Sequence, residues 1–442
     1  MIDYKKLLKS KKYNIAVWGT GYIGLSTLVY FAKQNVRCIG YDLDSSKVEK
    51  INNGDLPIKD LKNWFGFNIK KLVKEKKLKA TNNFNELIDQ KNLAHFVAIP
   101  TEKDGKPYFK ILFDVLNKIL KVKQIKKKYT PIIIIESTLT PGFSEKHLMP
   151  FFKKKKIKIG RDLLYSVAPR RDWFVEGTKS LRELDRVFGS TDKKSSRITK
   201  SILSIVCKKL HEASSHKVSE MVKSIENAYR HVEITLANQL SLAYPKENMR
   251  EVLKLVGTKW NIGTFYPGFG SGGYCIPLSS QYVLQDIKKK KDLTLLRETI
   301  KTDKNINLLI ARSLVKKRFK NIGVLGLSYK GNLKVSILSP IIPFVKELKK
   351  HKMNVKVFDP YYSKKEIHEI LSVKSFRFPQ DLKQFDCLIL AVDHDIFKKK
   401  TNLIFKNLNK VRFILDNNGV WENFKNKLKK HNYHVSGNTG WI

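Results

Sequence analysis

Short apolar runs, each ending at a glycine or a polar residue, recur through the first two hundred positions of this chain. They are Asn14–Gly19, Val36–Tyr41, His95–Thr101, Pro131–Thr138 and Leu164–Pro169. Apolar runs of about four to eight residues between turn signals are typical of buried strands in a parallel sheet. Between the first two runs, Leu25–Gln34 has the pattern of a helix. The alternation of strands and helices predicts one doubly wound α/β domain, which we place at residues 1–205.

A different pattern fills residues 218–243, where no glycine or proline interrupts and apolar residues recur at helical spacing. A helix of that length spans roughly 40 Å, enough to join two domains and to offer a face to a second copy of the chain. Lys223 and Asn227 lie four residues apart on it and therefore share one face. Taken alone, that spacing favours an exposed lysine beside a surface asparagine.

The opening pattern then repeats near the end of the chain. The repeat comprises the run Asn321–Gly326, a helix over Ile341–His351, the strand Val355–Asp359 and the later strands Cys387–Val392 and Phe413–Asp416. It predicts a second nucleotide-binding type of domain over residues 318–442, with a helical middle domain over 206–317. The fold class that we expect is therefore α/β, with two Rossmann-like doubly wound parallel-sheet domains joined by a long central helix.

Composition changes this picture little. The 442 residues carry a formal net charge of +46 and 42% hydrophobic residues, enough for real cores. Because the lysines are spread along the whole chain, we interpret the charge as a solvated surface and predict no specific nucleic-acid partner. The four cysteines have no metal-site spacing, so we predict no metal and a reducing compartment. No apolar signal core or membrane-length run occurs, which indicates a cytoplasmic protein without a membrane partner.

The first apolar run leads into a dinucleotide-binding turn. The residues expected to contact the cofactor there are Gly19, Gly21, Tyr22, Ile23 and Gly24. The first glycine permits the turn, the second lets backbone meet the pyrophosphate, and the third allows close helix packing. Asp42 ends the next strand, where a carboxylate accepts from both ribose hydroxyls, so we expect NAD in preference to NADP. The alternative is a βαβ unit with a glycine turn and no cofactor.

Polar residues also follow the two later strands of this domain. They are Pro100, Thr101, Glu136, Ser137 and Thr138. The carboxyl ends of parallel strands form the edge of the sheet where ligands bind. We therefore expect these residues to complete the cofactor site. The last domain has Gly326-Leu-Ser-Tyr-Lys-Gly331 in place of the dinucleotide turn, so we expect it to hold something other than NAD.

A glycine-rich segment before residue 277 is the most unusual stretch of the chain. Four glycines fall within residues 268–273, directly before Tyr274 and Cys275. Glycines let backbone approach a ligand closely, which predicts an exposed loop with Cys275 as a nucleophile and a substrate site around it. The substrate contacts that we expect in the loop are Phe269, Gly270, Gly272, Gly273 and Tyr274. The alternative is a surface turn with a buried cysteine.

Four segments together resemble the UDP-glucose/GDP-mannose dehydrogenase family, in that family's order and over nearly the whole chain. They are Gly-Thr-Gly-Tyr-Ile-Gly-Leu from Gly19, Glu-Ser-Thr-Leu-Thr-Pro-Gly from Glu136, Lys223-x-x-x-Asn227, and Gly-Gly-Tyr-Cys-Ile-Pro from Gly272. The Cys-Ile-Pro form is nearer to members that act on UDP-N-acetylhexosamines. The resemblance implies an enzyme of polysaccharide biosynthesis that uses NAD twice to oxidise the C6 alcohol of a nucleotide sugar to a carboxylate.

The resemblance also assigns roles to individual residues. Cys275 attacks the aldehyde carbon and holds the intermediate as a thiohemiacetal and then a thioester. Lys223 stabilises negative charge on the C6 oxygen, and Asn227 orients that oxygen or a water. Thr138 stands beside the nicotinamide, and Lys330 holds the diphosphate of the sugar nucleotide. A homodimer is the expected assembly.

Several positions depart from the family's pattern. They are Arg170, Asn261 within Trp260-Asn261-Ile262, Ser279 and Ile337, where the family has glutamate, an Asp-Pro-Arg-like segment, aspartate and arginine. Arg170 replaces a candidate general base with a cation, and Ser279 removes the carboxylate that follows the cysteine by four residues. Arg171, Asp172 and Glu176 are candidates to replace part of this chemistry.

Two other functions fit parts of the pattern. A β-hydroxyacid dehydrogenase also pairs an NAD domain with a Lys-x-x-x-Asn helix, but it lacks the second nucleotide-type domain and the cysteine loop. An inactive, NAD-binding relative with a regulatory role fits the missing polar residues. NADH production on a panel of nucleotide sugars separates these functions.

Overall fold

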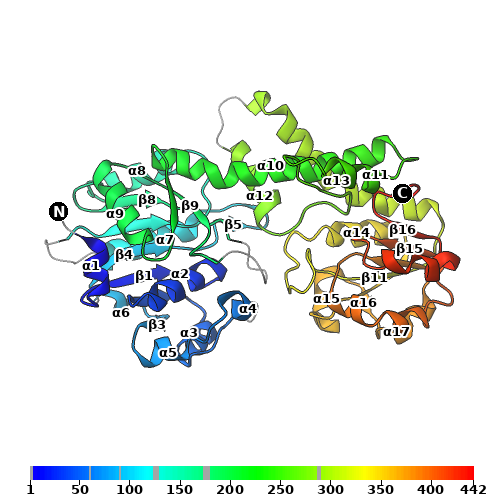
Figure 1. Ribbon diagram of the computed structural model, residues 1–442, viewed down its shortest axis with the longest axis horizontal. Helices are drawn as coiled ribbons and strands as arrows, with labels where there is room; N and C mark the ends of the chain where they lie inside the picture. The colour runs from blue at the N-terminus through cyan, green and yellow to red at the C-terminus, as the bar shows by residue number, and fades with distance from the viewer. Residues whose placement is uncertain (1–2, 59–60, 89–90, 123–128, 173–179, 286–289) are drawn as a thin grey trace. The chain divides into compact units, whose positions relative to one another are not determined.

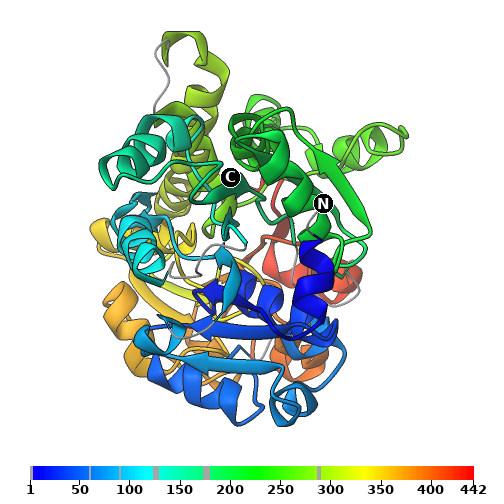
Figure 2. The same cartoon turned by 90° about the vertical axis from the view of Figure 1, so that its left-hand side faces the viewer.

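The computed structural model describes residues 3–58, 61–88, 91–122, 129–172, 180–285 and 290–442. The chain divides into two compact units, Met1–Glu226 with Gln281–Asp286, and Asn227–Ser280 with Ile287–Ile442. Each unit contains its own sheet with helices around it, and most neighbouring strands are parallel (Figure 1; Figure 2). The units are therefore described one at a time.

Within its described residues, the first unit has an eight-stranded sheet in the order β10-β9-β8-β7-β4-β1-β2-β3. The strands are β1 (Asn14–Trp18), β2 (Arg37–Tyr41), β3 (Leu78–Thr81), β4 (Asn92–Val97), β7 (Ile132–Ile135), β8 (Leu164–Val167), β9 (Asp185–Ser190) and β10 (Lys209–Glu212). All neighbours are parallel except β8 and β9, which are antiparallel. The five expected strands are confirmed, and the antiparallel pair departs from a purely parallel sheet.

Both faces of this sheet are covered, because successive side chains of each central strand enter opposite cores. Ile15 and Val17 of β1 belong to one apolar cluster, whereas Ala16 and Trp18 belong to another. The helices of this unit are α1 (Tyr4–Lys9), α2 (Tyr22–Lys33), α3 (Ser45–Asn52), α4 (Leu61–Phe65), α5 (Lys70–Lys74), α6 (Asn85–Ile88), α7 (Lys110–Val122), the π-helical η1 (Ser144–Leu148), α8 (Met149–Lys154) and α9 (Lys193–Leu203). A small hairpin joins β5 (Glu102–Lys103) and β6 (Lys106–Pro107).

The second unit has, in its described part, a six-stranded parallel sheet in the order β13-β12-β11-β14-β15-β16. The strands are β11 (Asn321–Leu325), β12 (Asn354–Phe358), β13 (Lys374–Ser375), β14 (Cys387–Leu390), β15 (Phe413–Asp416) and β16 (Tyr433–Val435). The helices and 3-10 turns around it are α14 (Ile341–Lys350), α15 (Lys364–Leu371), η3 (Gln380–Gln384), α16 (Asp395–Lys399), α17 (Thr401–Phe405) and η4 (Glu422–His431). Two apolar clusters again cover the two faces. The predicted repeat of the opening pattern is confirmed.

The middle of the chain is helical. Its elements are α10 (His216–Ala243), α11 (Met249–Val256), α12 (Cys275–Gln285), η2 (Lys290–Asp292) and α13 (Thr294–Lys316). The expected long helix is confirmed and has 28 residues. None of the helices in the described ranges has both the length and the apolar character that crossing a bilayer requires.

Candidate active site

The glycine turn after β1 has the geometry that a dinucleotide needs. A Cβ at Gly19, whose φ is +89°, would lie 2.5 Å from the carbonyl oxygen of Ala98, and one at Gly24 would lie 1.8 Å from that of Gly19. By contrast, a Cβ at Gly21 would meet nothing within 4 Å, and the N-cap position of α2 has no side-chain capping hydrogen bond. Tyr22 and Ile23 begin the helix. Two glycines thus allow close packing, and the third leaves room for a pyrophosphate at the helix N-terminus.

Asp42 stands at the end of β2 and holds this turn. One carboxylate oxygen accepts from the amide and the hydroxyl of Thr20, both at 2.8 Å, and the other accepts from the amide of Asp44 at 3.1 Å. Burial alone would raise the pKa of Asp42, but these hydrogen bonds and Lys47 outweigh burial and lower it. The carboxylate is therefore ionised at neutral pH, which fits a free ribose diol and disfavours a 2′-phosphate.

The ends of β4 and β7 are joined by hydroxyl groups. Ser137 accepts from the amide of Ile99 at 2.9 Å and donates to its carbonyl at 2.8 Å. Thr101 donates to the carbonyl of Thr138 at 2.7 Å. Thr101 and Ser137 are buried, Thr138 is half-buried and Pro100 is exposed. Of these residues, Thr138 and Pro100 are therefore the ones that keep exposed surface at this edge.

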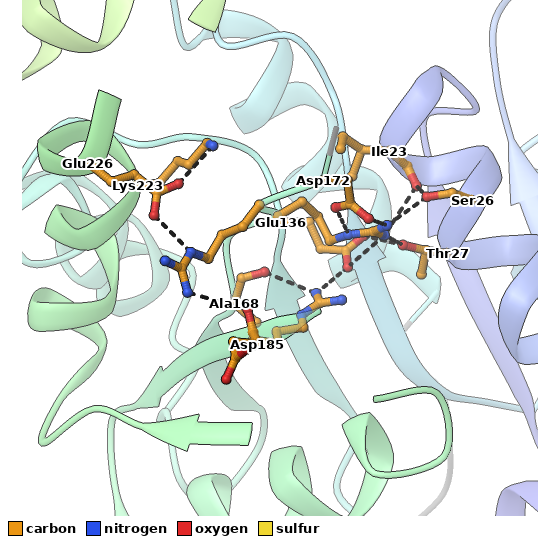
Figure 3. A network of polar contacts seen from close by, with 12 residues as sticks. Ile23, Ser26, Thr27, Glu136, Ala168, Asp172, Asp185, Lys223 and Glu226 are labelled. Carbon is orange, nitrogen blue, oxygen red and sulfur yellow. Dashed lines mark hydrogen bonds and ion pairs between the residues drawn. The ribbon is translucent and has the colours of Figure 1, made fainter. Parts of the chain in front are cut away.

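Glu136 has a different environment from its neighbours on the same loop. Its side chain has no exposed surface and accepts from Thr27 at 2.6 Å and from Arg186 (Figure 3). Arg170 approaches the same carboxylate at 3.7 Å and pairs with Asp172 at 2.6 Å. Of the replacements that we considered for the missing base, Asp172 therefore lies in a buried network, and Glu176 lies outside the described residues.

Lys223 is part of a second, partly exposed chain of charges (Figure 3). Its Nζ lies 2.9 Å from one oxygen of Glu226, and Nε of Arg171 lies 2.7 Å from the other. Arg171 also donates to the carbonyl of Asp185 at 3.3 Å. The sequence reasoning missed Glu226, although a carboxylate three residues after a lysine on one helix is a recognisable pairing signal. The pair holds the lysine ammonium in one place.

In the second unit the glycine loop is anchored by four hydrogen bonds to its backbone. The amides of Gly268, Phe269, Ser271 and Gly273 donate to Asn238, Asn417, Asp303 and the carbonyl of Ile337, at 2.8, 3.2, 2.8 and 3.1 Å. Ile337, which stands where the family has arginine, therefore supports the loop through its backbone. The side chain of Phe269 is 1% exposed and packs against Phe344, so its ring belongs to the core.

Tyr329 explains why two of the loop residues are glycines. A Cβ at Gly272 would lie 2.6 Å from Cβ of Tyr329, and one at Gly273 would lie 2.9 Å from Cζ of its ring. Burial raises the pKa of Tyr329, and the charge of Cys275 raises it further, so the phenol stays protonated. Tyr274 is half exposed beside it. Lys330 follows Tyr329 in the chain. Burial lowers the pKa of Lys330; the charge of Asp393 opposes this shift and that of Arg230 reinforces it.

Cys275 is exposed, and it is the first residue of α12. This corrects the expectation of a loop, since the glycine run ends where the helix begins. A helix N-terminus favours negative charge, as a thiolate requires. Asn227 donates to the hydroxyl of Ser279 at 2.9 Å and contacts the carbonyl of Cys275 at 3.4 Å. Ser279 thus offers a hydroxyl where the family has a carboxylate. Asn261, the fourth departure, is exposed.

The last domain contains a second version of the turn held by Asp42. The amide of Gly326 donates to Phe358 at 2.7 Å, as the amide of Gly19 donates to Tyr41 at 2.8 Å. Asp359 accepts from the amides of the two residues after Gly326 and of Tyr361, at 2.7, 3.1 and 2.9 Å, and contacts Nε2 of His394 at 3.1 Å. Nδ1 of His394 accepts from the amide of Asn332 at 2.9 Å, so Nε2 donates to Asp359.

Comparison with known proteins gives a consistent result. Residues 13–206 match the NAD binding domain of the UDP-glucose/GDP-mannose dehydrogenase family, 217–306 its central domain, and 323–423 its UDP binding domain. Protein CapL of Staphylococcus aureus is 30% identical over 414 residues, which cover 88% of this chain and 92% of CapL.

Two further matches come from Pyrococcus horikoshii. Its UDP-N-acetyl-D-mannosamine dehydrogenase is 28% identical over 394 residues, covering 87% of this chain and 90% of the relative. A solved structure of UDP-D-ManNAc dehydrogenase from this organism has a TM-score of 0.81 at 25% identity, and the match covers 97% of this chain and 100% of that one.

Proposed function

Because this chain belongs to the UDP-glucose/GDP-mannose dehydrogenase family, we propose that its substrate is a UDP-N-acetylhexosamine whose C6 alcohol it oxidises to a carboxylate. The chain is an NAD-dependent nucleotide-sugar dehydrogenase. The finer choice of sugar rests on the Cys-Ile-Pro sequence at residues 275–277 and on the substrate named for the relative from Pyrococcus horikoshii. As part of the proposal, the NAD, middle and sugar-nucleotide domains occupy residues 1–205, 206–317 and 318–442.

The observation that carries the proposal is the thiol of Cys275, exposed at the N-terminus of α12. When bound, NAD accepts one hydride from C6 in each of the two oxidations. Cys275 adds to the aldehyde carbon of the first product and forms a thiohemiacetal; loss of the second hydride makes a thioester. Water then opens the thioester, which releases the carboxylate and restores the thiol.

The polar residues around these steps have separate tasks. Lys223 stabilises the negative charge that develops on the C6 oxygen, and Glu226 holds its ammonium. Asn227 orients an oxygen of the substrate or a water, with its amide steadied by Ser279. Lys330 binds the diphosphate. Because Ser279 is not a carboxylate, hydrolysis of the thioester has no general base at that position, and we expect it to be the slowest step.

The sharpest test is to count products on a panel of UDP-sugars and GDP-sugars. The wild-type protein should form two NADH and one carboxylate per sugar, and intact-mass spectrometry during turnover should show an acyl adduct on Cys275. Cys275→Ala should lose acid formation by orders of magnitude while it still binds NADH. Cys38→Ala, which changes a buried cysteine, is the matched control. Unchanged acid formation by Cys275→Ala would refute the role of the thiol.

We also propose that the protein is a homodimer formed through its middle helices. Large apolar side chains are exposed there, including Tyr229 at 70%, Leu236 at 51% and Leu255 at 62%. A groove of about 450 Å³ lies between α10 and α13 and is lined by Leu242 and Leu309 among others. Exposed apolar surface of this kind is typical of an interface. Light scattering of the purified protein tests this, and Leu236→Glu should yield a monomer.

A further inference from the structure

We propose that Arg170 is a positioning residue for NAD, which holds the start of α2 against the carboxyl edge of the sheet. At this position the family pattern has a glutamate, a candidate general base. In this chain the guanidinium donates to residues of the helix that follows the dinucleotide turn, and the side chain of Arg170 is 1% exposed. The substitution therefore changes the role of the position from chemistry to cofactor binding.

The first support is that every N–H of Arg170 has an acceptor. Nε and one terminal nitrogen form two parallel bonds to the carboxylate of Asp172, at 2.6 and 2.7 Å. The same terminal nitrogen donates to the hydroxyl of Ser26 at 2.8 Å. The other donates to the hydroxyl of Thr27 and to the carbonyl of Ile23, the latter at 3.4 Å. Since a guanidinium has five N–H groups, the set is complete, and three of the five reach α2.

The second support is the balance of charge around the guanidinium. Glu136 and Asp172 are buried carboxylates, and Arg170 and Arg186 are the buried cations beside them. Burial opposes the charge of Arg170, but the two carboxylates more than compensate and raise its pKa. A buried ion is tolerated only when it is paired and hydrogen-bonded, so the guanidinium has no freedom to turn toward a substrate.

The third support is where these bonds lie on α2. Ile23 belongs to the dinucleotide turn itself, and Ser26 and Thr27 are in the next turn of the helix. The N-terminus of this helix provides the amides for the pyrophosphate, and a displacement of about 1 Å is enough to weaken such contacts greatly. Thr27 also donates to Glu136, so α2 is connected to the end of β7 as well as to Arg170. Arg170 thus fixes the position of the phosphate site relative to the carboxyl edge of the sheet.

The experiment is a fluorescence titration with NADH, which needs no sugar and is independent of the proposed substrate. Arg170→Lys keeps the charge but loses the parallel bonds and the reach to α2, and it should raise the Kd for NADH about tenfold. Ser26→Ala removes one acceptor on α2 and leaves both ion pairs intact; we expect an increase of about threefold. In steady state the KM for NAD should rise in both variants, with kcat at saturating NAD and the KM for the sugar nucleotide nearly unchanged.

Ser166→Ala is the matched control, because it removes a buried hydroxyl from β8, the strand that leads to Arg170. The hydroxyl of Ser166 bonds to Ser190 in β9 and Thr199 in α9, and within the described residues it makes no hydrogen bond to α2. The Ser166→Ala variant should have a lower melting temperature but an unchanged Kd for NADH. If Arg170→Lys and Ser26→Ala also lower the melting temperature but keep that Kd within about twofold, Arg170 is merely structural and the proposal fails. If Arg170→Lys does not fold, the Kd for NADH of the Ser26→Ala variant alone tests the proposal.

Discussion

We propose two functions for Asp42 that one substitution can separate. It carries a negative charge that disfavours NADP, and it accepts hydrogen bonds that hold the turn at Thr20. Asp42→Asn keeps an acceptor for the turn but removes the negative charge. We therefore expect the affinity for NADP, relative to that for NAD, to increase at least about tenfold, since one charge contact is worth about 1.4 kcal/mol.

Asp42→Ala should lose affinity for both cofactors, because the turn is no longer held. The control is Asp44→Asn, since an asparagine still caps α3. Dissociation constants for NADH and NADPH are the measurement. Equal affinity of the unmodified protein for the two cofactors would contradict the assignment of Asp42.

Lys223 depends on Glu226 for its position. Glu226→Gln preserves the size of the side chain but removes the charge that holds both Lys223 and Arg171. Loss of a hydrogen bond to a charged group costs about 1.5–3 kcal/mol, so we expect kcat to fall by about tenfold or more while the Kd for NADH is unchanged. Glu298→Gln is a close control, because Glu298 and Lys301 form an exposed pair with the same helical spacing. An equal loss in both variants would argue against a specific role.

The motifs around Gly19, Lys223 and Cys275 that indicate the family could be recognised because each lies within a few consecutive residues. The partners of Arg170 were not, because Ser26, Glu136 and Asp172 come from distant parts of the chain and only the fold brings them together. The bond between Asn227 and Ser279 was hidden for the same reason.

Among the elements, α10 contributes a titrating group to the first unit. Glu220 accepts from the amides of Gly142 and Ser144, at 3.1 and 3.2 Å. Burial raises the pKa of Glu220 to about 7, despite these bonds. Because the folded pKa lies above the unfolded one, the protonated form is favoured in the fold. The contribution of Glu220 to the free energy of unfolding is therefore fully present below about pH 4.5, and it declines as the pH rises toward about 7.

In the wild type, this group should lower the free energy of unfolding by about 3 kcal/mol as the pH rises between these values. Glu220→Gln should abolish that loss. We expect the variant to be more stable than the wild type at pH 8 and similar to it at pH 5. Melting temperatures across this range are the measurement, with the exposed Glu298→Gln as the control. A wild-type and a variant curve of the same shape would refute the raised pKa.

The polarity of a strand decided whether it could be predicted from the sequence. The buried strands of both sheets were predicted because they are continuous apolar runs, such as β7 with four isoleucines. In contrast, β9 and β10 are too polar, and β10 has exposed residues along most of its length. The start of α12 at Cys275 was missed, although Pro277 was a signal, since proline is tolerated in the first turn of a helix.

At the scale of the whole molecule, the two halves should respond separately to substitution. Lys330 belongs to the second compact unit, and the dinucleotide turn belongs to the first. Lys330→Ala should raise the KM for the sugar nucleotide about tenfold, as expected for one lost charge contact, and leave the Kd for NADH unaltered. Lys334→Ala, which breaks an exposed pair with Glu366, is the control. No change in either constant would place the diphosphate elsewhere.

The duplicated turn has a consequence for stoichiometry. Asp42 retains exposed surface for a ribose, whereas Asp359 is 1% exposed and engaged by three amides and His394. We therefore expect the two copies of the fold to provide a single dinucleotide site, so that NADH saturates at one equivalent per chain. In the reaction that we propose, two hydrides leave each sugar, so the spent cofactor has to be exchanged midway. The covalent bond to Cys275 would keep the half-oxidised sugar in place during that exchange.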